Sequence, residues 1–287
     1  MTGRGAALVA LIAACNHRPA PAPVPPAPPP ASPPPPRADL LRAADVALAD
    51  KVKAFLDAPE HGAALIRPLE DGGIAQLFRH DIGFGATAHA QPAFERGVGC
   101  TFGALERSER TVMVRVDCEW KDAAPSFVVD PRIERTPRER GIVFTWQDAR
   151  AMASLRAEAA EVFGPVPATT PPPDDLRAAF ELLGSPLADA RVGESCGENG
   201  GPPAGKRAVS AIAKAGRFDL LRIVARGLSP DGRVYALRAL RARPGGLDRE
   251  DAPLFERVRK LDVPIRVCSG CMNRDRKACD VLEDEEL

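Results

Sequence analysis

Residues 97–120, GVGCTFGALERSERTVMVRVDCEW, restrict the fold more than any other stretch of the chain. Apolar and polar residues alternate in both halves of this stretch, which is the pattern of β-strands with one buried face. If the chain reverses about Glu109, four apolar pairs lie opposite one another: Val98–Trp120, Cys100–Cys118, Phe102–Val116 and Ala104–Val114. Opposite residues of antiparallel strands have Cα atoms about 4.5–5.5 Å apart, which suits a disulfide. The sequence therefore predicts a hairpin closed by a Cys100–Cys118 disulfide, and the alternative is two free cysteines in its buried face.

Residues 38–164 combine this hairpin with further helices and strands. Apolar residues recur every three or four positions in 39–57, which predicts an amphipathic helix. Stretches 126–130 and 141–146 predict strands. A helix is expected from about Trp146 to Phe163, and its first turn carries a capping-box spacing from Thr145 to Asp148. The segment is therefore expected to be a small α+β domain with an antiparallel meander.

Three histidines of this segment, His61, His80 and His89, lack the spacing of a known metal motif. We interpret them as histidines of surface loops. The arginine-rich stretch 131–141 mixes charges of both signs with prolines, which predicts a solvated loop between strands. An anion-binding patch is the alternative for that stretch.

A proline-rich linker, residues 165–175, predicts a boundary before a second folded segment, 176–280. This second segment predicts short helices separated by turns. Gly227 takes a helix C-cap position, and Ser229-Pro230 takes the positions of an N-cap and a first helical proline. Residues 281–287 are expected to form an acidic tail, with a frayed end at 283–287.

The stretch DLLRIVARGLSPDGRVYALRALRA, residues 219–242, resembles the paired short helices of HEAT-type repeats. This resemblance implies a stacked scaffold with a surface for protein partners. An irregular helical bundle is the alternative. The expected fold class is α+β, with a small N-terminal antiparallel meander and flanking helices followed by an all-α, HEAT-like region.

The N-terminal residues 1–15 read MTGRGAALVALIAAC, a single arginine and an apolar run that ends at Cys15. The run is shorter than the roughly 20 residues that cross a bilayer, and its layout is that of a secretory signal. The stretch Ile12-Ala13-Ala14-Cys15 resembles the lipobox of bacterial lipoproteins. The resemblance implies a diacylglyceryl group on Cys15 and a membrane anchor. The residue after it, Asn16 rather than Asp, favours the outer membrane by the same analogy; an ordinary signal is the alternative.

Residues 16–37 are expected to be a spacer after this anchor. Twelve of the twenty residues 18–37 are proline, and proline supports neither helix nor sheet. At about 3.1 Å per residue, a polyproline chain of this length extends roughly 60 Å. A target for proline-recognising domains is the alternative.

The cysteines outside the hairpin raise the question of metal, redox or structural chemistry. With Cys15 lipidated, six cysteines remain, which in an oxidising compartment indicates three disulfides. Besides the hairpin pair they are Cys196, Cys268, Cys271 and Cys279. We interpret these four as disulfide-bonded, with a connectivity that spacing does not decide. A zinc site of the four thiolates and a redox C-x-x-C at Cys268 and Cys271 are the alternatives.

Composition narrows the function classes. Acidic and basic residues number 39 each and aromatics are 5%, which argues against nucleic-acid binding. The sequence favours a non-enzymatic cell-envelope lipoprotein, a tethered scaffold without a cofactor that binds protein partners. The alternatives are a thiol–disulfide oxidoreductase, a hydrolase and a periplasmic small-ligand binder.

Overall fold

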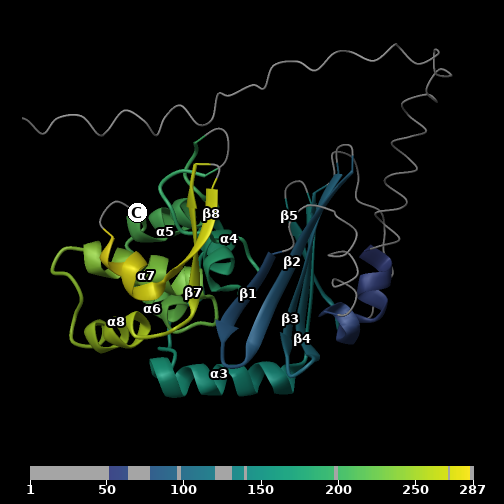
Figure 1. The fold of residues 1–287 in the computed structure, drawn as a ribbon, viewed down its shortest axis with the longest axis horizontal. Coiled ribbons are helices and arrows are strands. Elements are labelled where there is room, and N and C mark those ends of the chain that lie inside the picture. Colours follow the sequence, from purple (N-terminus) through teal and green to yellow (C-terminus); the bar gives the residue numbers. More distant parts are fainter. Residues whose placement is uncertain are drawn as a thin grey trace, which may run out of the picture. The chain divides into compact units, whose positions relative to one another are not determined.

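The computed structural model describes residues 52–63, 78–95, 98–119, 131–138, 141–196, 200–270 and 272–284 of the chain. The predicted signal and spacer, the predicted strand 126–130 and Cys271 all lie outside these ranges. Residues 41–287 form one compact unit. Its described part contains a six-stranded sheet followed by helices and a two-stranded hairpin (Figure 1).

All neighbouring strands of the six-stranded sheet are antiparallel. The register between its two central strands pairs Cys100 with Cys118, which confirms the register predicted from alternation. The predicted Val98–Trp120 pair is not covered, because Trp120 lies outside the described residues. In hydrogen-bonding order the strands are β1 (Phe78–Gly83), β2 (Ala86–Glu95), β3 (Val98–Arg107), β4 (Arg110–Glu119), β6 (Gly141–Gln147) and β5 (Glu134–Arg138).

One face of the sheet buries the apolar residues of the central hairpin. Residues 52–57 form a helix against this face, and the rings of Phe55 and Phe102 meet edge to face with centroids 5.4 Å apart. The Cys100–Cys118 disulfide lies in the same buried layer. From Cys100 to Ala104 and from Val114 to Cys118, every second side chain therefore enters one core, as the alternation predicts.

The helices follow the sheet in sequence. Asp148 caps the first of them and accepts a hydrogen bond from the Ala151 amide at 3.0 Å, whereas Thr145 lies within β6. Figure 1 shows this helix crossing the ends of the strands. The predicted Ser229 cap is confirmed, because its hydroxyl accepts from the Gly232 amide at 3.1 Å. The helices are α3 (Ala149–Phe163), α4 (Asp174–Gly184), α5 (Ala204–Lys214), α6 (Phe218–Ala225), α7 (Pro230–Ala242), α8 (Asp251–Arg259) and α9 (Ala278–Glu283).

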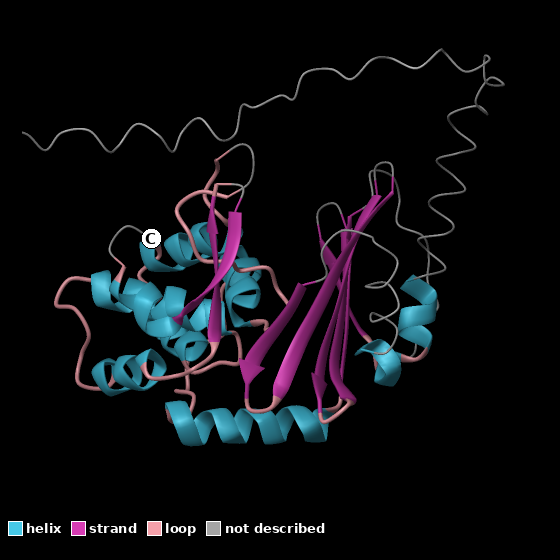
Figure 2. Ribbon diagram, in the orientation of Figure 1, coloured by secondary structure: helices cyan, strands magenta, loops and turns pink. Residues whose placement is uncertain are grey.

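The prediction of a small meander followed by an all-α, HEAT-like region is wrong in two respects. The sheet has six strands rather than a small meander, and β5 lies beyond β6 at its edge. The C-terminal region is not all-α, because it contains an antiparallel hairpin of β7 (Pro264–Ser269) and β8 (Met272–Lys277), drawn in magenta in Figure 2. Residues 131–141 and the residues around His80 were predicted to be loops, but they contain β5 and β1. The spacing of apolar residues in the C-terminal half predicted helices, and the charged sequence of β8 gave no indication of a strand.

A continuous apolar core joins the helices to the sheet. Ile82, Leu105 and Val112 of the sheet belong to the same buried cluster as the apolar faces of α3 to α8. The proline-rich stretch 165–175 runs between α3 and α4 on the outside of this core. The sheet and the helices therefore pack as one body, and a surface between them has a defined shape.

Candidate functional site

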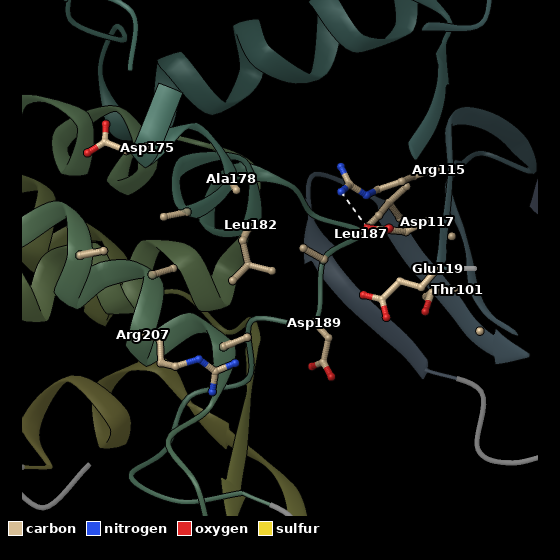
Figure 3. A pocket seen from close by; sticks show the side chains of 17 residues that line it. Thr101, Arg115, Asp117, Glu119, Asp175, Ala178, Leu182, Leu187, Asp189 and Arg207 are labelled. Atoms are coloured by element: carbon tan, nitrogen blue, oxygen red, sulfur yellow. Dashed lines mark hydrogen bonds and ion pairs between the residues drawn. The ribbon is translucent and has the colours of Figure 1, made fainter. Parts of the chain in front are cut away.

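A cleft of about 740 Å³ lies between the sheet and the helices α4 and α5. The outward face of β3 and β4 forms one wall, and α4, α5 and the loop residues 187–189 form the other (Figure 3). Ligand pockets of proteins commonly measure about 300–1,000 Å³. This cleft is therefore large enough for a small molecule or a short peptide.

The sheet wall of the cleft follows from strand alternation. The residues of β3 and β4 that do not enter the buried layer point the other way, toward the helices. On β3 they are small, with Gly99, Thr101 and Gly103 in sequence. On β4 they are charged: Arg115, Asp117 and Glu119. A shallow trough over β3 is thus bordered by a row of charged side chains.

The helical wall is built from alanines. They are Ala178 and Ala179 of α4 and Ala204, Ala208 and Ala211 of α5. Alanine keeps a helix surface smooth and leaves space in front of it. Contact between the walls occurs at Gly103, where an added Cβ would lie 3.3 Å from the Cβ of Leu187. Leu187 therefore closes the cleft at one end, and the remaining space lies beside it.

The loop that carries Leu187 and Asp189 is fixed to β7. The Val192 amide donates to the Arg266 carbonyl at 2.8 Å, and the Cys268 amide donates to the Val192 carbonyl at 2.8 Å. A disulfide joins Cys196, at the end of this loop, to Cys268 in β7. These bonds hold the loop at both sides of residue 192, so that the helical wall of the cleft has a rigid support.

Charged groups dominate the polar lining of the cleft. Arg115 donates to Asp117 at 3.2 Å within the β4 row, shown as a dashed line in Figure 3. Asp189 accepts two hydrogen bonds from Arg191, at 2.8 and 2.7 Å. Within the described part of the chain, Glu119 forms no ion pair. Carboxylates and guanidinium groups of this kind bind charged ligands through ion pairs and hydrogen bonds.

Buried charges lie where the sheet meets the helices, outside the cleft. Arg233 of α7 is 1% exposed, donates to the Ile82 carbonyl at 3.3 Å and lies 4.5 Å from the centroid of the Phe163 ring. Burial lowers the pKa of Arg233 to about 10. Asp231 pairs with Arg266 at 2.5 Å. These contacts join α7 to β1, to α3 and to β7, the strand to which the loop of the helical wall is bonded.

Two of the three histidines of the first segment do not lie in surface loops as predicted, whereas His61 is exposed, at the end of the short 3-10 helix Pro59–His61. His80 in β1 and His89 in β2 are each 3% exposed. His89 lies 3.3 Å from Glu106, and burial lowers the pKa of His80. The residues around His80 and His89 are mainly polar or small, and this composition does not indicate burial. For that reason the prediction of surface loops was wrong at these two positions.

The predicted cysteine sites have different outcomes. Cys100–Cys118 and Cys196–Cys268 are disulfides. Cys15 and Cys271 lie outside the described residues. Cys279 forms no disulfide with a described cysteine, and its sulfur lies 3.5 Å from the carboxylate of the adjacent Asp280. Because Cys271 lies outside the described residues, the disulfide expected for Cys279 stays a prediction. The two disulfides indicate an oxidising, extracytoplasmic environment.

Neither alternative chemistry of the tail cysteines has its required arrangement. A four-thiolate zinc site needs Cys196 and Cys268 as thiolates, and the two are bonded to each other. A redox C-x-x-C would join Cys268 to Cys271 at a helix start, but Cys268 lies in β7. In the ranges that the structure describes, no group of three or more metal-ligating side chains could hold a metal ion.

The cleft as a whole has no signature in the sequence. Its signal for the β4 row was present, because alternation placed Arg115, Asp117 and Glu119 on the face opposite the cysteines. The opposing wall depends on contacts between segments far apart in the sequence, such as Gly103 and Leu187, which no local pattern encodes. Comparisons with protein-family models, curated proteins and solved structures give no match. Among the described residues, no helix combines the length and the apolar character needed to cross a membrane.

Proposed function

We propose that the chain is a non-enzymatic, lipid-anchored binding module of the cell envelope. The observation that carries this proposal is the cleft, whose walls belong to one core and whose loop is fixed to β7 by a disulfide. A preorganised cleft loses little conformational freedom when a ligand enters, which favours binding. Its polar groups are carboxylates, guanidinium groups and one hydroxyl, which suit recognition of a charged partner.

The anchoring half of the proposal rests on the N-terminal sequence. Cys15 ends a lipobox-like stretch, and the proline-rich residues 16–37 follow it directly. Lipidation of Cys15 would tether the chain to the envelope membrane, with the outer membrane favoured by Asn16. A spacer of roughly 60 Å would then hold the cleft away from the lipid surface, where protein partners reach it. The oxidising environment indicated by the two disulfides agrees with this location.

A periplasmic small-ligand binder is the second candidate. The specific observation in its favour is the volume of the cleft, about 740 Å³, which falls within the range of small-molecule pockets. Most such pockets are lined by apolar and aromatic side chains. The charges of the β4 row therefore restrict a small ligand to a polar, charged molecule.

The anchor is tested by expressing the full chain in a bacterium and analysing its N-terminal peptide by mass spectrometry. We expect Cys15 to carry a diacylglyceryl group, and the chain to sediment with membranes. The Cys15→Ala variant is expected to leave the membrane fraction. An unmodified Cys15 in a soluble chain would refute the anchor.

Binding at the cleft is tested by thermal melting of the mature chain with amino acids, short peptides, polyamines and sugars. A ligand at one hundred times its Kd stabilises the fold by about 2.7 kcal/mol, or a rise in Tm of about 5–10 °C. Ala178→Trp fills the cleft from α4 and should remove this rise. Ala252→Trp, a matched change at an exposed position of α8, should preserve it. Equal effects of the two variants would show that binding occurs elsewhere.

A further inference from the structure

A second pocket, of about 460 Å³, lies on the opposite face of α5 from the cleft and is bordered by α7 and by the end of α9. Its lining includes the buried ring of Tyr235. The Tyr235 hydroxyl donates to the Arg191 carbonyl at 2.9 Å and accepts from the Gly193 amide at 3.3 Å. The pocket is therefore fixed to the loop before Cys196, and its volume suits a small molecule.

Two arginines of α7 line this pocket from one face of the helix, because Arg238 and Arg241 are three residues apart. Arg238 donates to the Val281 carbonyl at 3.4 Å, and Arg241 donates to the Leu282 carbonyl at 3.2 Å. Since these carbonyls are consecutive in α9, the two guanidinium groups lie close together. Each of the two bonds uses one of the five N–H donors of a guanidinium, which leaves donors on both groups for a ligand.

The carboxylates of the pocket do not neutralise these arginines. Among the residues that the structure describes, neither Arg238 nor Arg241 forms an ion pair. The three carboxylates that line the pocket each pair with another cation, and these pairs are Glu194–Lys206, Glu283–Arg259 and Asp284–Arg276.

The half-buried position of Arg238 adds a second argument for an anion. Burial lowers the pKa of Arg238, even though the carboxylates of Asp284 and Glu194 lie near enough to raise it. A desolvated charge beside a like charge is unfavourable, and an opposite charge in contact with both relieves it. The two guanidinium groups therefore make this pocket complementary to an anionic ligand.

The donors of the pocket favour a phosphate over a carboxylate. A carboxylate has two oxygens, which a single guanidinium satisfies with two parallel hydrogen bonds. A phosphate monoester has three terminal oxygens and about two negative charges at neutral pH. Two guanidinium groups match that charge, and the hydroxyl of Ser210 on α5 lines the same pocket. Val209 and Ala239 provide an apolar surface for the organic part of a ligand.

We propose that this pocket binds a phosphate monoester, whose phosphate group is held by Arg238 and Arg241. The site is separate from the cleft, so that the inference goes beyond the proposed function and does not depend on it. The same phosphate group occurs on soluble metabolites and on the headgroup of phosphatidic acid, and the test distinguishes these two sources.

The test is isothermal titration calorimetry of the full-length, mature chain in a buffer without phosphate. The compounds are glycerol 3-phosphate, glycerol, citrate and dihexanoyl phosphatidic acid, which is a soluble phospholipid. We expect glycerol 3-phosphate to bind, and glycerol and citrate not to bind. Tighter binding of the phospholipid would identify a lipid headgroup as the source, whereas equal or weaker binding would identify a soluble phosphate.

Variants of the two arginines locate the site. Arg238→Gln and Arg241→Gln should each raise the Kd for glycerol 3-phosphate at least about tenfold, because each removes hydrogen bonds between charged groups. Arg257→Gln makes the same change at an exposed position of α8, away from the pocket, and should leave the Kd unchanged.

A second pair of variants keeps every contact of α9 in place. Ala242→Glu puts a carboxylate at the exposed end of α7, four residues after Arg238, where it pairs with that guanidinium. It should abolish binding of glycerol 3-phosphate. Ala252→Glu, a matched change at an exposed position of α8, should preserve it. Melting curves confirm that each variant is folded.

Three results would overturn the inference. The same Kd for glycerol 3-phosphate in Ala242→Glu and Ala252→Glu would place its binding outside this pocket. Binding of citrate alone, lost in Arg238→Gln, would make the ligand a carboxylate. Binding of none of the compounds would exclude an oxyanion site. Ala178→Trp fills the cleft and should leave this binding unchanged, so that a failure here is distinguished from a failure of the proposed function.

Discussion

Removal of the Cys196–Cys268 disulfide should lower the stability of the chain more than removal of any other single cross-link described. The bond joins residues 72 positions apart, whereas Cys100 and Cys118 are 18 positions apart. In the chain-entropy model, a cross-link stabilises the fold by restricting the unfolded chain, and its effect grows with the logarithm of the loop length. For these separations the model gives about 4 kcal/mol for Cys196–Cys268 and about 3 kcal/mol for Cys100–Cys118.

The folded structure supports an effect through the unfolded state. The loop before Cys196 keeps its two hydrogen bonds to β7 through residue 192 when the sulfurs are removed. The Cys196→Ala/Cys268→Ala variant should therefore retain the folded cleft. At about 2–4 °C per kcal/mol for a chain of this size, its Tm should fall by about 10–15 °C.

The assay is urea unfolding followed by far-ultraviolet circular dichroism, with the Cys100→Ala/Cys118→Ala variant as the matched comparison. Both variants lack one disulfide, and they differ in the length of the closed loop. A smaller loss of unfolding free energy for the Cys196–Cys268 variant than for the hairpin variant would refute the reasoning from chain entropy. The slope of the unfolding transition with urea should also rise, since a less restricted unfolded chain exposes more surface.

Three further changes have expected outcomes in the same unfolding assay. Gly232→Ala would make a Cβ overlap with the Leu183 carbonyl and should lower the free energy of unfolding by about 1–3 kcal/mol. Gly184→Ala has open space around it and should stabilise α4 by about 0.5–1 kcal/mol. A lower free energy of unfolding in both variants would contradict the packing argument. Burial lowers the pKa of His80, so that near and below pH 6.5 the folded chain binds fewer protons than the unfolded chain. The free energy of unfolding should therefore fall as the pH falls through that value. His80→Phe should make this dependence on pH weaker, and an unchanged dependence would assign it to other groups. Arg233→Ala should cost about 2–5 kcal/mol through the cavity that it leaves, and Arg233→Met should cost less because it fills the same space; equal losses would mean that the charge and not the volume matters.

The parts of the fold that could be predicted are those in which a local pattern and a pairing rule agree. The hairpin of β3 and β4 alternates in both strands, and a one-residue slip would expose its whole buried face. Its register was therefore determined by the sequence alone, including the position of Cys100 opposite Cys118. The Ser229-Pro230 start of α7 is similarly local, because a cap needs only its own first turn.

The strands at the edges of the sheet could not be predicted in this way. β5 has the sequence ERTPR and β1 has the sequence FRHDIG. Each pairs with a single neighbour, so that it needs no two-sided apolar pattern, and a proline such as Pro137 is tolerated there. Charge and proline content made both stretches resemble loops. The predicted sheet therefore lacked its two edge strands, and the surface that faces the helices was predicted to be smaller than it is.

The cleft depends on the same long-range contacts that the sequence does not reveal. Its two walls come from β3–β4 and from α4–α5, and among the contacts that join the helices to the sheet is the hydrogen bond from Arg233 of α7 to the Ile82 carbonyl of β1. Apolar residues could fill this junction with similar burial, but their contacts are non-directional. Hydrogen bonds from a guanidinium fix both distance and angle. The buried Arg233 therefore adds a directional contact to the apolar core that joins the helices to the sheet.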